Sequence, residues 1–248
     1  MKVEREYNMI KVHVTPITPK SIFDKFLKDE SVLINYLRPE NYKAAVKDNH
    51  CKYIYIDNGA YTYFRKGITP NYDNFYHWLE NKEYDYFFIP DVIDGNEQDN
   101  NNLIELMPNK FKAKSIPVYH LHEDLSRLDY LMNKDFTYIA LGASGKYWNV
   151  GSDIWFDRMD EIMKILCNSN GYPKVRIHAL RCLNPKVFIY FPFYSADSSN
   201  LAQNHSKRGA LNMLNRLRCF DAPKKYDFKK EQLSIYDLLA MQEQGILL

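Results

Sequence analysis

Carboxylates, imidazoles and glycines recur in this sequence directly after short runs of β-branched and aromatic residues. Carboxylates gathered in one pocket would shift one another's pKa values, which acid/base and nucleophilic chemistry requires. An Asp after a strand also serves commonly as a helix N-cap or a turn residue, so no single one identifies a site. Their recurrence in run after run favours a shared pocket. The residues are Asp57, Asp91, Asp94, His120, His122, Gly142, His178 and Asp197.

The segment VYHLHED carries His120 and His122 as an H-x-H pair, which could ligate a metal, but no third ligand is evident. We therefore expect His120 and His122 to line the pocket or to satisfy hydrogen bonds in the core, and we expect His120 and His178 to contact the substrate. The segment ALGASG, with Gly142 and Ala143, lacks the full fingerprint of a dinucleotide or phosphate site. It indicates a close approach of the backbone to a flat ligand. The sequence thus predicts neither a metal nor a cofactor.

The elements that must position these residues are short strands alternating with helices. Several of the strand-like runs are apolar almost throughout, as parallel strands covered on both faces are. Helical spacing appears at 71–82, 123–134 and 155–168, and the tail 204–240 indicates two helices separated at Pro223. The strand-like runs span 10–14, 32–37, 52–57, 84–91, 116–122, 136–142, 174–180 and 187–193.

This alternation predicts a single α/β domain over residues 1–248, a (β/α)₈ TIM-like barrel with additional C-terminal helices. An open doubly wound sheet is the alternative, because the link 180–187 is too short for a helix and the run 10–14 could form an edge hairpin. In a barrel the carboxyl ends of the strands converge on one face. We therefore expect Asp57, Asp91, Gly142 and Asp197 to line one pocket.

Composition limits the range of partners and locations. The formal net charge of the 248 residues is only +2, so an argument for nucleic acid depends on local clustering. Lys207, Arg208 and Arg216 form such a cluster in the segment 204–218, although basic residues on one helix are commonly just a solvated face. The four cysteines show no C-x-x-C pairing, and the amino terminus lacks a signal-peptide run. We expect a cytoplasmic protein that does not span a membrane.

The order of the motifs resembles the tRNA-guanine transglycosylase superfamily. Asp-x-Gly-Ala-Tyr follows one strand and Pro-Asp the next, and ALGASG, IHALR and SADSS come after them, together covering about residues 52–200. More narrowly, the chain is similar to the compact phage-type branch that inserts 7-deazaguanines into DNA. The cysteine-rich zinc site typical of the tRNA enzymes is missing from this sequence.

The resemblance implies a role for each matched residue. Asp57 corresponds to the general acid/base, and Tyr61 to an aromatic residue that stacks on the base. Asp91 corresponds to the residue that reads the guanine edge, and Gly142 with Ala143 to backbone groups that face the base. Asp197 corresponds to the nucleophile, although its surroundings, Ser-Ala-Asp-Ser-Ser, differ from those in the tRNA enzymes.

The implied activity is the exchange of guanine for a free 7-deazaguanine base, such as preQ0, through a covalent Asp–nucleotide intermediate. DNA is the expected polymer, and tRNA is the alternative. A catalytically silent barrel that serves as a nucleic-acid-binding subunit stays open, as does an unrelated barrel hydrolase in which His120 and His122 bind metal.

Overall fold

The computed structural model describes residues 8–15, 29–47, 51–204 and 209–229. Its strands are all parallel and form one sheet in the order β5-β4-β3-β2-β1-β9-β8-β7-β6. They are β1 (Ile10–Val14), β2 (Ser31–Asn35), β3 (Ile54–Asp57), β4 (Tyr86–Phe88), β5 (Ser115–Ile116), β6 (Val118–His120), β7 (Tyr138–Gly142), β8 (Arg176–Ala179) and β9 (Ser195–Ser198).

The two ends of this sheet meet at Pro117. β5 pairs with β4, β6 pairs with β7, and only Pro117 separates β5 from β6 along the chain. Proline has no N–H to donate, but its carbonyl accepts a hydrogen bond from the Ala140 N–H of β7 at 2.9 Å. On the other side, the Ile116 carbonyl accepts from the Ile89 N–H beyond β4, also at 2.9 Å. Residues 115–120 thus act as one interrupted strand, and the sheet closes into an eight-stranded barrel.

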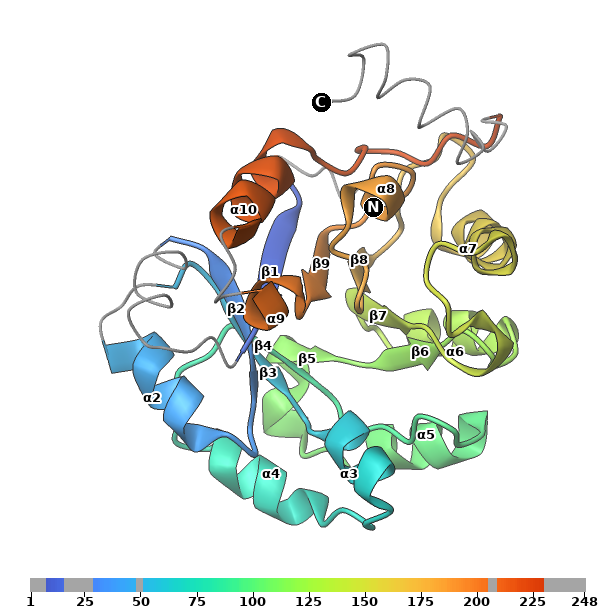
Figure 1. Ribbon diagram of the computed structural model, residues 1–248. Coiled ribbons are helices and arrows are strands. Elements are labelled where there is room, and N and C mark those ends of the chain that lie inside the picture. The colour runs from blue at the N-terminus through green and yellow to red at the C-terminus, as the bar shows by residue number, and fades with distance from the viewer. Residues whose placement is uncertain (1–7, 16–28, 48–50, 205–208, 230–248) are drawn as a thin grey trace.

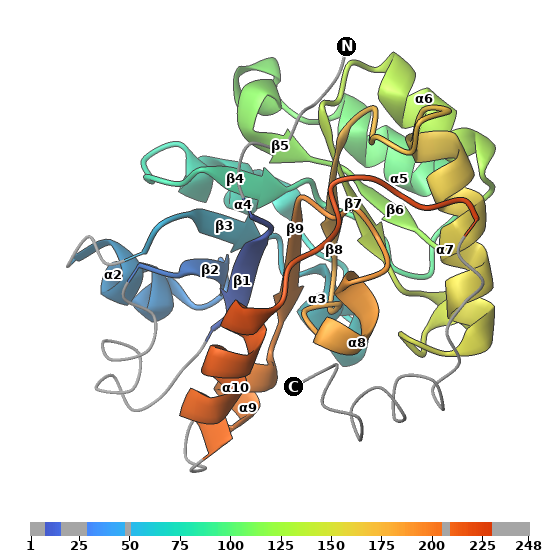
Figure 2. The same cartoon turned by 90° about the horizontal axis from the view of Figure 1, so that it is seen from above.

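Helices surround the strands, as Figures 1 and 2 show from two directions. They are α2 (Pro39–Lys47), α3 (Ala60–Lys66), α4 (Tyr72–Leu79), α5 (Glu97–Glu105), α6 (Ser126–Asn133), α7 (Asp153–Leu166), α8 (Pro185–Phe188), α9 (Asn200–Asn204) and α10 (Gly209–Cys219), with short 3₁₀ turns at Asn109–Lys114 and Gly145–Tyr147. No helix among the described residues is long and apolar enough to cross a membrane.

Two apolar cores follow from the alternation of side chains along each strand. The larger core lies between the strands and the helices, and the smaller one fills the barrel with residues such as Val12, Tyr55, Phe88 and Tyr138. Positions two residues further along these strands also face inward, but they stand at the carboxyl end of the barrel. Asp57 follows Tyr55 in this way, which explains why a polar residue ends an apolar strand.

The structure confirms the predicted barrel and corrects one of its strands. The run 187–193 was predicted to be the last strand, but α8 begins at Pro185 and ends inside this run. Pro185 fits the first turn of a helix, and the Asn184 side chain caps it by accepting the Lys186 N–H at 3.1 Å. A short apolar run is compatible with either element, and here the local cap decides.

When β5 and β6 are counted as one strand, the eighth strand of the barrel is β9, whose sequence SADS shows no apolar run. β9 is buried throughout, because its small side chains Ser195 and Asp197 point into the narrow barrel. β1 lies between β2 and β9, so the run 10–14 is a barrel strand rather than an edge hairpin. In the tail, α10 is confirmed, residues 220–229 form no helix, and the remainder of the second predicted helix lies outside the described residues.

Candidate active site

Three carboxylates meet at the carboxyl ends of the strands. Asp57 is the last residue of β3, Asp91 follows β4 by three residues, and Asp197 lies near the end of β9. Burial raises the pKa of Asp57 to about 6, and the negative charges of Asp91 and Asp197 contribute to the same rise. The charges of Asp91 and Asp197 act on Asp57 because the barrel brings the three groups to the same end of the sheet, although 140 positions of sequence separate the first from the last.

Asp57 is held by two donors from its own neighbourhood. The Asn35 Nδ2 group donates to Oδ2 at 2.8 Å, and the Gly59 N–H donates to Oδ1 at 3.1 Å. Gly59 has a φ of 81°, and a Cβ added there would lie 3.0 Å from Cδ1 of Leu37. The glycine of the Asp-Asn-Gly-Ala-Tyr motif is therefore required by the turn that aims its N–H at Asp57.

Asp91 is oriented through both of its oxygens. Asn58, which is buried, donates to Oδ1 at 2.7 Å and also to the Ile89 carbonyl at 2.8 Å. Nε2 of His120 lies 2.9 Å from Oδ2. Because both oxygens already have a partner, a base that binds Asp91 would add to these contacts rather than fill an empty carboxylate.

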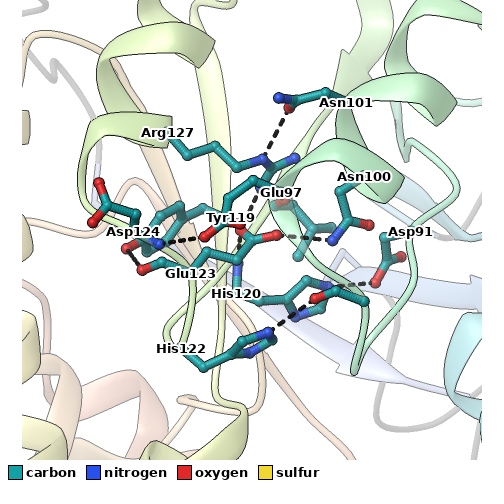
Figure 3. Close-up of polar contacts among 12 residues, drawn as sticks. Asp91, Glu97, Asn100, Asn101, Tyr119, His120, His122, Glu123, Asp124 and Arg127 are labelled. Atoms are coloured by element: carbon teal, nitrogen blue, oxygen red, sulfur yellow. Dashed lines mark hydrogen bonds and ion pairs between the residues drawn. The ribbon is translucent and has the colours of Figure 1, made fainter.

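The buried Glu123 and its partners hold His120 in place, as Figure 3 shows. Its Oε2 accepts the His120 N–H at 2.9 Å and pairs with the Arg127 guanidinium, while Oε1 accepts from Asn100 at 2.8 Å. The sequence alone does not predict this cluster. The spacing of Glu123 and Arg127 matches an ordinary surface pair on a helix, and only the fold places it in the interior.

One ring nitrogen of His120 is unused. Nδ1 is buried and has no hydrogen-bond partner within the described part of the chain. It faces Gly142, where an added Cβ would approach this nitrogen to 3.2 Å. The Gly142 carbonyl accepts the Leu121 N–H, whereas Ala143 takes part in no backbone hydrogen bond among the described residues. A ligand at this point would meet His120 and the backbone of Ala143.

Asp197 has one engaged and one available oxygen. Oδ1 accepts the Arg181 N–H at 2.9 Å and lies 3.2 Å from Nε2 of His178, whereas Oδ2 has no partner among the described residues. His178 is fully buried, and its Nδ1 contacts the Ser195 hydroxyl. We predicted that His178 contacts the substrate, but its position connects it to Asp197 instead.

An aromatic pair stands at the rim of the site. Tyr61 and Trp148 are 47% and 39% exposed, and their rings stack with centroids 6.2 Å apart. The Arg181 guanidinium lies over the Trp148 ring at 4.4 Å from its centroid. Arg181 has a φ of 63°, a strained conformation for a side chain of this size. The residue that donates to Asp197 through its backbone thus also reaches the rim through its side chain.

A cavity of about 330 Å³ opens beside Asp91, between α3 and the loop after β4. Its walls are largely aromatic and apolar, and Asp91 is one of its acidic residues. Among its lining residues are Tyr63, Phe64, Tyr72, Asp91 and Val92.

The two histidines of the H-x-H pair are committed to different partners. His120 contacts Asp91, whereas Nδ1 of His122 lies 2.7 Å from the Ser144 hydroxyl and Nε2 lies 3.0 Å from the Gly95 carbonyl. Residues 8–15, 29–47, 51–204 and 209–229 hold no group of three metal-ligating side chains. The metal-dependent hydrolase therefore gains no support from the geometry.

The predicted phosphate contacts are only partly visible. Lys207 and Arg208 lie outside the described residues. Arg216 is exposed in the last turn of α10, near Arg218, which binds Glu30 just before β2 begins. Arg216 therefore lies toward the amino ends of the strands, away from the three carboxylates.

No protein-family model matches this chain, and no curated protein matches it. Solved structures do share its fold. One described as "Native KDPGal structure" is 7% identical, with a TM-score of 0.52 over 88% of this chain and 100% of its own. A mutant tryptophan synthase alpha-subunit from Pyrococcus furiosus is 10% identical, with a TM-score of 0.52 over 86% and 95%. Likenesses at such identities confirm the barrel and leave its chemistry to be argued from the site.

Proposed function

We propose that this protein exchanges guanine in a nucleic acid for a 7-deazaguanine base such as preQ0. The observation that carries the proposal is the meeting of Asp57, Asp91 and Asp197 at one barrel mouth, each in a different environment. Asp57 has a raised pKa, Asp91 is oriented through both oxygens, and Asp197 keeps one oxygen that has no partner in the described part of the chain. Base exchange needs such a division between a proton carrier, a reader and a nucleophile.

The first half of the reaction forms a covalent intermediate. Oδ2 of Asp197 attacks C1′ of the nucleotide while the bond from C1′ to N9 of guanine breaks. The electron pair of that bond stays on guanine, which takes a proton from Asp57. With a pKa of about 6, Asp57 is protonated in roughly a tenth of the molecules at pH 7, near the range in which a carboxyl can both give and accept a proton.

The second half reverses these events with another base. The incoming 7-deazaguanine loses its N9 proton to the ionised Asp57, and its N9 attacks C1′. The bond between C1′ and Asp197 breaks, and its electron pair returns to the carboxylate. Asp57 ends the cycle protonated, as it began, so the exchange requires no oxidant and no other co-reactant.

Base recognition is assigned to the groups that face this reaction centre. Asp91 accepts the N–H donors of the guanine edge, which adenine does not offer in the same pattern. Nδ1 of His120, which has no partner among the described residues, and the backbone of Ala143 beside it are additional candidates for contact with the base. Tyr61 and Trp148 provide flat apolar surfaces at the rim for the base or its neighbours.

DNA is the proposed polymer, because the four cysteines do not form the zinc-site cluster typical of the tRNA enzymes. A base inside a duplex cannot reach carboxylates at the mouth of a barrel. The target nucleotide must therefore be flipped out or lie in a single strand.

The proposal is tested with DNA and tRNA that carry labelled guanine, each mixed with the full-length protein and free preQ0. We expect release of label and a 7-deazaguanine nucleoside in digested DNA by mass spectrometry. Both products should disappear with Asp197→Asn and persist with Asp129→Asn, which alters an exposed aspartate on α6. Exchange with tRNA but not with DNA would identify tRNA as the substrate. Binding to either polymer without release of guanine would favour the catalytically silent barrel.

A further inference from the structure

A series of hydrogen bonds between buried side chains runs through the barrel and ends at Asp197. Tyr55 and Tyr138 join through their hydroxyls at 3.1 Å, and Tyr138 in turn contacts the Ser195 hydroxyl. Ser195 contacts Nδ1 of His178, whose Nε2 lies 3.2 Å from Oδ1 of Asp197. All five side chains are buried, and they come from β3, β7, β8 and β9.

The available protons decide which group donates in each of these hydrogen bonds. An ionised carboxylate only accepts hydrogen bonds, so Nε2 of His178 must carry the proton that faces Asp197. A neutral imidazole then leaves Nδ1 as an acceptor, and the single proton of Ser195 is used there. The Ser195 oxygen accepts from Tyr138, and the Tyr138 oxygen accepts from Tyr55. Every contact in the series is then satisfied without any charge besides that of Asp197.

Two further observations support this arrangement of donors. Burial raises the pKa values of Tyr55 and Tyr138 above the usual range, so both phenols keep the protons that they must donate. The imidazole is also packed between rings, with its centroid 4.9 Å from that of Phe88 and 5.7 Å from that of Tyr55. The ring cannot turn over easily to present Nδ1 to Asp197.

We infer that His178 is a positioning residue for Asp197, and that the Asp197 carboxylate and the Ser195 hydroxyl together hold it in the Nε2–H tautomer. Together, the Nε2–H group and the Arg181 N–H hold Oδ1, which directs Oδ2 toward the ligand. In the other neutral tautomer, a lone pair would face Oδ1 and release the carboxylate from this orientation. The catalytic consequence rests on the proposed function, in which Asp197 is the nucleophile. The tautomer itself does not depend on it.

The tautomer is measured by nuclear magnetic resonance on the full-length protein labelled with ¹⁵N-histidine. Two-bond correlations distinguish the protonated ring nitrogen from the unprotonated one, and the spectrum of His178→Gln identifies the signals that belong to His178. We expect Nε2–H in the wild type at neutral pH. A proton on Nδ1, alone or together with one on Nε2, would overturn the inference without the need for any further variant.

Two variants separate the tautomer from simple loss of packing. Ser195→Ala removes the donor to Nδ1 and should lower the preference for the Nε2–H form, although the Asp197 carboxylate still requires a donor at Nε2. Tyr138→Phe leaves the Ser195 contact intact and should keep the Nε2–H form. In formation of the covalent adduct with DNA, Ser195→Ala should be slower by about 10- to 100-fold, as when other partners that orient a reactive group are removed. His178→Gln retains an N–H donor and should be faster than His178→Ala.

The outcomes distinguish this inference from the proposed function. If the wild type shows the Nε2–H form but neither adduct nor exchange, the proposed function fails and the assignment of His178 stands. If the adduct forms and Ser195→Ala changes neither the tautomer nor the rate, the exchange activity stands and the inference about Ser195 is wrong.

Discussion

At the scale of single residues, three chemically identical groups differ only because their surroundings differ. Asp57 loses water and has negative neighbours, which favour its neutral form, while the donors Asn35 and Gly59 partly oppose that effect. Asp197 instead receives two donors on one oxygen. In the proposed reaction the same side chain therefore acts as a proton carrier in one position and as a nucleophile in the other.

The raised pKa of Asp57 predicts a dependence of stability on pH. The folded protein keeps the Asp57 proton up to about pH 6, whereas the unfolded chain loses it near the ordinary aspartate pKa of 3.8. The folded state thus binds more protons in this window, and its stability falls as the pH rises from about 4 to about 6. Asp57→Asn should remove this loss, worth about 3 kcal/mol.

Urea unfolding of both proteins at several pH values checks this prediction. The stability of Asp57→Asn relative to the wild type should rise between pH 4 and 6 and then become constant above about pH 7. A difference that does not change with pH would mean that Asp57 ionises normally in the folded protein.

The roles of Asp197 and Asp57 should also separate in covalent chemistry. Asp197→Asn keeps the shape but removes the attacking oxygen, so no protein–DNA adduct should form. Asp57→Asn keeps the nucleophile and loses the proton donor, which should slow exchange by about 10² to 10⁴. Denaturing gel electrophoresis of protein mixed with DNA shows the adduct as a shifted band. An adduct that survives in Asp197→Asn and disappears in Asp57→Asn or Asp91→Asn would transfer the covalent role to another carboxylate.

At the scale of elements, polar side chains fix the connections between strands and helices around the site. Asn58 ties the start of α3 to Asp91, and Asn100 of α5 bonds both the N–H and the carbonyl of Val92 in the loop after β4. Glu123 then joins this loop region to β6 and α6 through Asn100, His120 and Arg127. Hydrogen bonds inside the protein thus replace the water that surface loops normally use.

The ion pair of Glu123 and Arg127 should therefore matter far more than a surface pair. Both side chains are almost completely buried, so Glu123→Gln leaves an uncompensated cation and should cost about 3 kcal/mol. Glu105→Gln breaks an exposed pair with Lys134 and should cost much less. Urea unfolding of the two variants compares them directly. Equal effects would mean that water reaches the Glu123 site.

At the scale of the whole molecule, the closed barrel gives the site one open direction. Asp57, Asp91 and Asp197 stand at the carboxyl ends of the strands, and the exposed Tyr61 and Trp148 border them. In the proposed function, the nucleic acid approaches from this end. The placement of Arg216 near the opposite end changes our expectation for that residue, although Lys207 and Arg208 stay candidates for phosphate contact.

Substitution at the two ends should distinguish the faces. Trp148→Ala removes a stacking surface and should weaken binding of single-stranded DNA by about 1 to 3 kcal/mol. Arg216→Ala should leave the affinity and its dependence on salt unchanged, whereas loss of one phosphate contact would lower the log–log slope by roughly one unit. Titration of a labelled oligonucleotide at several salt concentrations measures both quantities. A larger effect of Arg216→Ala would place the nucleic acid along α10.

The sequence by itself determined the barrel and most of its strands, because apolar runs alternating with helical spacing have few other ways to bury both faces of a sheet. It also placed Asp57, Asp91 and Asp197 together, since the carboxyl ends of parallel strands must converge. Such patterns indicate which residues are buried and in what order, but they do not show which side chains contact one another.

Only the tertiary structure decided which groups touch. The apolar run 187–193, predicted as a strand, begins within the capped helix α8. The polar segment β9 takes its place as a barrel strand, because only small side chains fit the narrow interior. In the structure His178 contacts Asp197, where we had predicted a contact with the substrate, and Glu123 lies in the interior. These contacts join strands distant in sequence, and their energies depend on burial and direction, which exist only once the barrel has closed.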